Sequence, residues 1–296
     1  MEIGLIDVDS HNYPNLALMK ISAYEKSQGN QVEWWNGLFH YDKVYQAKVF
    51  DETYSKEFNW CINADEIIKG GTGYDLDNKL PDHIEHIYPD YSIYPELTKD
   101  TAYGFLTRGC PRHCAFCIVG DKEGLKSHQV AELSEFWRGQ KNIEILDPNI
   151  TASNECLKLF KELAETGSWV NFNQGIDIRF MDEEKAALLN QIKTSMIHFA
   201  WDNYEFNTYE KLKKFRPLFT KDVRRLTVYV LTNFNTTHEQ DLERIYKLRE
   251  LNYDPYVMIY DKPNAPRETR LLQRWVNNKR IFRSCRNFND YDPKKG

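Results

Sequence analysis

Strand-like and helix-like segments alternate along the sequence from about residue 99 to its end. Each predicted strand is followed by a segment with helical periodicity. Such a repeat favours parallel strands, because only a parallel pair needs a helical crossover. Six units are too few for an eight-stranded barrel, so residues 99–296 are predicted to form a partial (β/α)6 TIM-like barrel ending in a basic segment. The predicted strands are residues 102–107, 143–146, 170–173, 196–201, 226–231 and 256–260.

A smaller α/β pattern precedes this region. Residues 1–80 contain strand patterns and one helix pattern, which predict a small open, Rossmann-like domain. Pro81, Pro89 and Pro95 then exclude a long helix, so residues 81–98 are expected to be an extended linker. The predicted elements are strand 3–8, helix 15–28 and strands 32–35, 43–50 and 66–69.

Charge and hydropathy indicate where the protein works and which partners it has. No stretch approaches the roughly 18 apolar residues that a membrane helix needs, so we expect a cytoplasmic protein with no membrane partner. The net charge of −5 does not favour nucleic acid as a partner. A basic segment near the end is either a solvated face or a patch for a phosphate-bearing substrate. It comprises Arg267, Arg270, Arg274, Lys279, Arg280, Arg283 and Arg286.

Three of the six cysteines lie in the stretch RGCPRHCAFCIV, residues 108–119, just after the first strand of the long region. Structural zinc usually takes four ligands in two pairs, and no second pair exists here. A thioredoxin-type pair, Cys114 and Cys117, would leave Cys110 unused. An iron-sulfur cluster held by three thiolates uses all three cysteines and leaves one iron without a protein ligand. The other cysteines, Cys61, Cys156 and Cys285, are predicted to be structural.

The CxxxCxxC spacing of Cys110, Cys114 and Cys117, with the aromatic Phe116 before the last cysteine, resembles the radical S-adenosylmethionine (radical SAM) superfamily. The resemblance implies a [4Fe-4S] cluster on the three cysteines, with SAM chelating the fourth iron. It also implies reductive cleavage of SAM to a 5′-deoxyadenosyl radical, which abstracts hydrogen from a substrate. An electron donor such as flavodoxin or ferredoxin would be needed, and the small-molecule substrate stays open.

The same resemblance implies SAM contacts at the ends of the predicted strands. Asp147 and Asn149 follow the second strand, where many members carry Gly-Gly-Glu, and Asp202 stands where relatives often have a glutamate near the ribose. Helix caps and loop turns are the alternative roles for such residues. The residues implied are Phe116, Asp147, Asn149, Gln174, Arg179, Asp202 and Asn233.

The first domain carries a second resemblance. Asp9-Ser10-His11 resembles the start of the DxHxxG motif of cobalamin-binding domains that precede many radical SAM enzymes, although Pro14 stands where glycine is expected. Gly70 to Gly73 (GGTG) would suit a turn that approaches a flat cofactor. Three alternatives stay open: a degenerate domain that binds no cobalamin, a cobalamin-dependent radical SAM methyltransferase, and a non-catalytic iron-sulfur or cobalamin-binding sensor.

Overall fold

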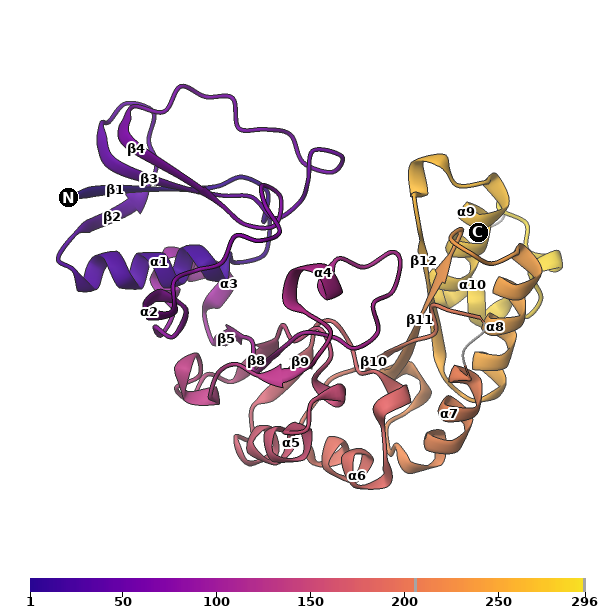
Figure 1. Cartoon of the computed structure of the whole chain (residues 1–296). Helices are drawn as coiled ribbons and strands as arrows, with labels where there is room; N and C mark the ends of the chain where they lie inside the picture. The colour runs from indigo at the N-terminus through magenta and orange to yellow at the C-terminus, as the bar shows by residue number, and fades with distance from the viewer. Residues whose placement is uncertain (205–206, 295–296) are drawn as a thin grey trace. The chain divides into compact units, whose positions relative to one another are not determined.

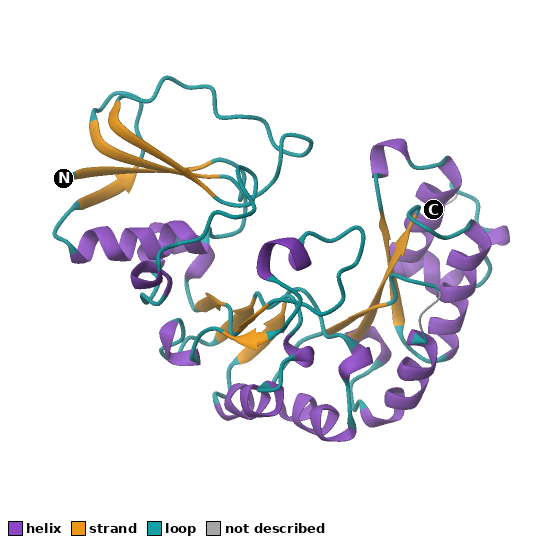
Figure 2. Cartoon of the chain, viewed as in Figure 1, coloured by secondary structure: helices purple, strands orange, loops and turns teal. Residues whose placement is uncertain are grey.

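The computed structural model describes residues 1–204 and 207–294, and the chain forms two compact units, Met1–Leu146 and Asp147–Gly296 (Figures 1 and 2). Both units mix helices with parallel strands, which confirms the predicted α/β class. Each unit has its own buried apolar clusters. No helix in the described part of the chain is long and apolar enough to cross a membrane.

A four-stranded parallel sheet opens the first unit, in the order β2-β1-β3-β4. Helix α1 covers one face (Figure 1), where Leu5 packs with Leu18 and Ile21 of the helix. Tyr41 and Val44 belong to a buried cluster that also takes side chains from the loops. The elements are β1 (Glu2–Asp7), α1 (Leu16–Ser27), β2 (Gln31–Trp34), β3 (Tyr41–Ala47) and β4 (Ala64–Gly70), within a few residues of prediction.

The segment 81–98 differs from the expected extended linker. It contains α2 (Asp82–Glu85), a 3-10 turn (Tyr91–Ile93) and α3 (Pro95–Thr98). Proline disrupts only a helix interior, and it suits the first helical position, which Pro95 occupies. Ile84 is buried against α1, so this segment packs into the first unit and the predicted boundary lies inside it.

The first unit ends with the start of the strand and helix repeat. Strands β5 (Thr101–Gly104) and β8 (Asn142–Ile145) are parallel neighbours. Between them, β6 (Thr107–Arg108) pairs antiparallel with β7 (His128–Gln129). The predicted strand 102–107 is therefore split, because its last residue pairs with a different partner strand. Helix α4 (Val119–Glu123) lies between β6 and β7.

The second unit continues the predicted alternation. Its strands are β9 (Trp169–Phe172), β10 (Ile197–Ala200), β11 (Leu226–Thr232) and β12 (Asp254–Ile259), and β10, β11 and β12 form one parallel sheet. Helices α8, α9 and α10 lie on one side of β11 and β12 (Figure 1). The six-unit barrel itself stays a prediction. The helices are α5 (Cys156–Glu165), α6 (Glu183–Gln191), α7 (Thr208–Phe215), α8 (His238–Glu250), α9 (Arg267–Asn277) and α10 (Lys279–Ser284).

Two local features follow from short-range sequence patterns. Thr237 and Gln240, at the spacing of a capping box, form one at the start of α8. Cys156 lies on the buried face of α5 with Leu159 and Phe160. Burial raises the pKa of the Cys156 thiol to about 12, so it is an inert core residue, as predicted.

Candidate functional site

The three clustered cysteines lie on one closed loop between β6 and β7, which we call the cysteine loop (residues 109–127). The backbone N–H of Cys110 donates to the carbonyl of Gly124 over 3.0 Å, and that of Cys117 donates to Cys114 over 2.9 Å. All three thiols and Phe116 are half-buried. The loop thus presents three potential thiolate ligands from a backbone that its own hydrogen bonds hold in place.

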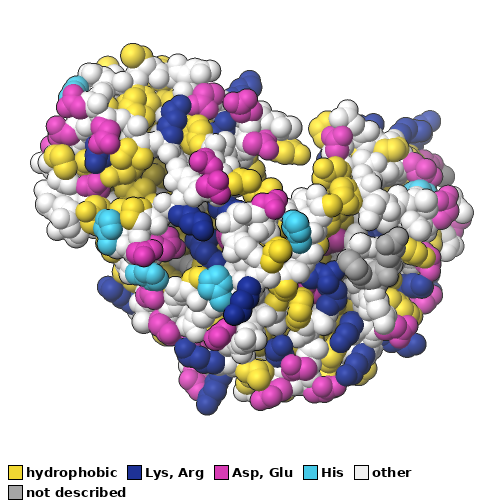
Figure 3. Space-filling view, viewed as in Figure 1, with side chains coloured by type: hydrophobic (Ala, Val, Ile, Leu, Met, Phe, Trp, Pro, Cys, Tyr) yellow, Lys and Arg dark blue, Asp and Glu magenta, His cyan; other side chains and the backbone are white. Residues whose placement is uncertain are grey.

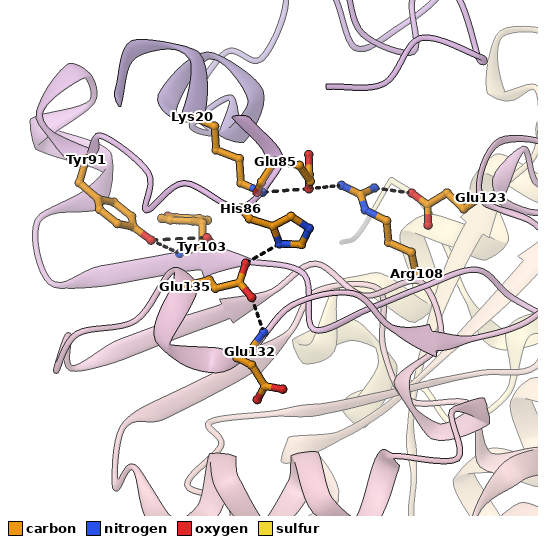
Figure 4. Close-up of polar contacts among 9 residues, drawn as sticks. All are labelled: Lys20, Glu85, His86, Tyr91, Tyr103, Arg108, Glu123, Glu132 and Glu135. Carbon is orange, nitrogen blue, oxygen red and sulfur yellow. Dashed lines mark hydrogen bonds and ion pairs between the residues drawn. The ribbon is translucent and has the colours of Figure 1, made fainter. Parts of the chain in front are cut away.

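Charged side chains tie the ends of this loop together (Figure 4). Arg108 donates to Glu123 over 2.8 Å and also reaches Glu85 at 3.4 Å. The second oxygen of Glu123 accepts the backbone N–H of Gly109 at 3.3 Å. Lys20 of α1 completes the chain with a 2.9 Å contact to Glu85. None of these acidic and basic partners was singled out from the sequence.

Glycine is required at position 109. Its φ is +84°, and a Cβ there would lie 2.2 Å from the carbonyl oxygen of Lys126. A side chain would therefore force the two ends of the cysteine loop apart. The "RGC" that opens the motif is explained by this backbone packing.

The donor set can be tested against an iron-sulfur cluster. Three half-buried thiols on one short loop are the chemistry that such clusters use. Among residues 1–204 and 207–294, however, no three His, Cys, Asp or Glu side chains converge closely enough to hold a metal ion. The residue types fit a cluster, and the side-chain positions are not those of an assembled ligand shell.

Residues near the loop have local roles. His113 is exposed and lies 3.4 Å from Asp121. Lys122 donates to the hydroxyl of Thr72 in the GGTG turn, and burial lowers the pKa of its ammonium group. This contact joins the cysteine loop to the turn after β4 of the four-stranded sheet β2-β1-β3-β4, which we call the front sheet, within the first unit.

The two features that resemble a cobalamin domain have structural explanations. Both carboxylate oxygens of Asp9 accept backbone N–H groups, from Val49 at 2.7 Å and Phe50 at 2.9 Å. Gly71 has a φ of +100°, and a Cβ there would lie 2.3 Å from the carbonyl oxygen of Lys48. The glycine turn therefore approaches this chain's own backbone, which is not the cofactor approach expected from sequence.

His11 remains available to a ligand. It is exposed and has a φ of +51° just after β1. Large apolar side chains are also exposed in this part of the chain, and apolar atoms are visible over the front sheet region in Figure 3. They include Leu38, Phe39, Tyr54 and Trp60.

A polar cluster forms in the second unit, which we call the strand-end cluster (Asn149, Asp177, Arg179, Asp202, Asp241 and Arg244). Arg179 donates to both oxygens of Asp177, at 2.7 and 2.9 Å. Asn149 donates to Asp177 over 3.1 Å and also caps the turn at residues 150–152. Asn149 and Arg179, selected separately from the sequence, are thus brought together by a residue that was not selected.

Asp202 belongs to the same cluster. Burial raises the pKa of its carboxyl group to about 6, while Arg179 and Arg244 act to lower it. Arg244 is fully buried and donates to the carbonyls of Trp201 and Leu231, at 2.5 and 2.7 Å, and to Asp241 at 2.5 Å. It therefore holds the ends of β10 and β11.

The other implied contacts fall outside this cluster. Gln174 is exposed, and Asp147 is buried. Asn233 has a φ of +61° and donates to the carbonyl of Tyr260 over 2.8 Å, so it serves as a turn residue. Phe116 lies in the first unit, on the cysteine loop.

The residues of the basic segment fall into two groups, one packed and one exposed. Lys279 is half-buried and pairs with Asp254 at 3.0 Å, so it belongs to the packing of β12 and α10. The arginines of this segment are exposed, as both a solvated face and an anion-binding patch require. They are Arg267, Arg270, Arg274, Arg280, Arg283 and Arg286.

The sequence around Arg244 contains a signal for its buried, paired state. It lies between the apolar positions Leu242 and Ile245 of α8, and a charged residue directly beside a buried stripe is a candidate for a paired core residue. Asp177 carried a similar signal, since it lies two residues before Arg179 at a turn.

Comparison with known proteins bears on the fold. No family model matches the sequence, and no curated protein matches it. Among solved structures, the chain is similar to the radical S-adenosylmethionine methyltransferase TsrM from Kitasatospora setae, solved with cobalamin and a [4Fe-4S] cluster bound. The TM-score is 0.59 at 11% sequence identity, over 87% of this chain and 74% of that chain. The chain therefore has a mixed α/β fold like that of a radical SAM enzyme.

Proposed function

We propose that this chain is a radical SAM enzyme whose cluster is held by Cys110, Cys114 and Cys117. The observation that carries the proposal is the closed cysteine loop, which follows the first strand of the α/β repeat in a chain with the fold of a radical SAM enzyme. The proposed organisation is an α/β domain at 1–80 and a radical SAM region at 99–296, connected by residues 81–98, whose short helix α2 packs against α1.

The three thiolates would hold the [4Fe-4S] cluster and leave one iron for SAM. When bound, the cluster would supply an electron for cleavage of SAM to methionine and a 5′-deoxyadenosyl radical, which takes hydrogen from the substrate. The protein's own contribution is to fix the loop and to exclude water from the reacting groups. We propose that the electron comes from a flavodoxin or ferredoxin.

SAM contacts are proposed for the strand-end cluster. Arg179 and Asp202 offer a cation and a half-buried carboxyl group at the ends of β9 and β10, which is the edge where parallel α/β sheets bind ligands. Asp202 would accept hydrogen bonds from ribose hydroxyls when ionised. Arg244 would act only through the backbone that it holds.

The test is product analysis on anaerobically reconstituted protein with SAM and a strong reductant. Wild type should form 5′-deoxyadenosine, and Cys110→Ala, Cys114→Ala and Cys117→Ala should each abolish it and reduce bound iron and sulfide. Cys61→Ala is the matched control, because Cys61 is an exposed cysteine outside the loop. Equal product from all four variants and wild type would refute the proposal.

A cobalamin-dependent radical SAM methyltransferase is the second candidate. It is favoured by the similarity to TsrM, a methyltransferase with cobalamin bound, and by exposed His11 after β1. Protein supplied with cobalamin should then show corrinoid absorbance and form S-adenosylhomocysteine, and His11→Ala should weaken any cobalt-histidine signature. A reconstituted cluster with neither product would instead indicate a non-catalytic sensor.

A further inference from the structure

Both carboxylate oxygens of Glu123 accept hydrogen bonds from residues at the start of the cysteine loop. One oxygen accepts Arg108, and the other accepts the N–H of Gly109. The next residue, Gly124, accepts the N–H of Cys110 through its carbonyl. Residues 123 and 124 therefore hold residues 108 to 110 through these hydrogen bonds, which we call the clamp. Cys110, the first of the three clustered cysteines, is one of the residues that the clamp holds.

This clamp is partly sheltered from solvent. The Glu123 side chain is 11% exposed and that of Arg108 is 28% exposed. Arg108 also stacks over the ring of Phe105, with 4.0 Å between the guanidinium carbon and the ring centroid. Charge-assisted hydrogen bonds in such surroundings are stronger than exposed ion pairs, so the clamp can order the loop.

The clamp continues to the front sheet. Arg108 reaches Glu85 of α2, and Glu85 accepts Lys20 of α1, whose side chain is 11% exposed (Figure 4). Lys20 and Glu85 are 65 residues apart in sequence. One chain of charges thus runs from the helix of the front sheet to Arg108, two residues before the first cysteine.

We propose that Arg108 and Glu123 are positioning residues for the cysteine loop, and that Lys20 and Glu85 couple the order of that loop to the front sheet. The clamp needs no iron to form, since every contact in it is made by protein atoms. That an ordered cysteine loop serves catalysis rests on the proposed function. The existence of the clamp is independent of that function.

The first test uses the full-length protein without metal. The rate at which iodoacetamide alkylates Cys110, Cys114 and Cys117 is measured by mass spectrometry, with hydrogen exchange over residues 108–118. Glu123→Ala should raise both rates about tenfold, because the loop loses two hydrogen bonds. Glu123→Gln should recover part of the protection, since its amide oxygen can still accept the Gly109 N–H.

Glu135→Gln is the matched control. Glu135 pairs with His86 at 2.8 Å and accepts the N–H of Glu132, so it lies in the same region without contacting the cysteine loop (Figure 4). It should leave the alkylation rates unchanged. Lys20→Met should raise them about twofold, because it removes only the far end of the chain.

The second test is spectroscopic. After reconstitution, Glu123→Ala should shift the midpoint potential and the electron paramagnetic resonance g-values of the cluster, whereas Glu123→Gln should lie closer to wild type. If Glu123→Ala does not fold, Arg108→Lys carries the same test, because lysine cannot reach both carboxylates. Wild-type alkylation and exchange in the folded variant would overturn the proposal. If the variants differ in protection but the wild-type protein binds no iron on reconstitution, the clamp is sustained and the proposed function is refuted.

Discussion

The cysteine loop and the strand-end cluster both depend on arginine and carboxylate pairs, but they differ in burial. Arg108 and Glu85 each keep 28% of the side chain exposed, whereas Arg244 is fully buried and Asp241 is 3% exposed. A partly exposed ion can regain water when its partner leaves, and a buried ion cannot. The pairs of the first unit therefore set the order of one loop, while those of the second unit support the fold around them.

Arg244→Met should have the largest effect on stability. It removes four hydrogen-bonded contacts at the ends of β10 and β11 and leaves the carboxylate of Asp241 buried without its cation. Breaking one side of a buried pair costs about 3–5 kcal/mol. The measurement is the free energy of unfolding in urea.

A double variant separates charge from packing. Asp241→Asn with Arg244→Met removes the isolated charge and should recover part of the loss, because the two residues contact each other directly. A loss below about 1 kcal/mol for Arg244→Met alone would contradict the comparison, since that is the range of exposed pairs.

Gly109→Ala should have the next largest effect, now on the cysteine loop. Alanine at a φ of +84° is strained, and its Cβ would meet the carbonyl oxygen of Lys126 at 2.2 Å. We expect a cost of about 3 kcal/mol, seen mainly as faster alkylation of the three thiols. Gly139→Ala is the matched control, because its φ is +99° and a Cβ there would have no neighbour within 4 Å. Equal effects of the two substitutions would show that close packing at Gly109 is unimportant.

The sequence predicted features that depend on residues close to one another in the chain. The capping box at Thr237 and the buried face of α5 depend on neighbours a few residues away, and periodicity identified the strands of both units. The spacing of Cys110, Cys114 and Cys117 is equally local, and cluster binding by these thiols stays a prediction. Gly109 and Glu123 are 14 residues apart and Lys20 and Glu85 are 65 apart, so nothing local indicates that they meet. Proline spacing misled at 81–98, because proline also starts short helices.

The pH dependence of stability should separate Asp202 from its neighbours. Its native pKa of about 6 lies above the usual value near 3.8, so protons bind more tightly to the native state. The stability that Asp202 contributes is present below about pH 4 and is lost as the pH rises through about 6. Relative to Asp202→Asn, wild type should lose about 1–2 kcal/mol over that interval.

This experiment compares urea unfolding of the two proteins between pH 4 and 7.5. Arg179, Arg244 and Asp177 face Asp202 electrostatically and are present in both proteins, so their direct contributions cancel in the difference. Parallel stability curves would show that the Asp202 carboxyl group is not perturbed. A steeper difference in Arg179→Met would confirm that Arg179 opposes the burial effect.

The smallest expected effect is at the start of α8, the helix that carries Arg244. The Thr237 hydroxyl accepts the N–H of Gln240 at 3.3 Å, and the Gln240 side chain accepts the N–H of Thr237 at 3.0 Å. Thr237→Ala should lower the free energy of unfolding by about 1 kcal/mol. Thr237→Ser should retain most of this stabilisation, because the serine hydroxyl can make the same cap. Thiol alkylation in the first unit should be unchanged in both, because the cap contacts only its own helix. If Thr237→Ala exposed the cysteine loop, the two regions could not be treated as separately held.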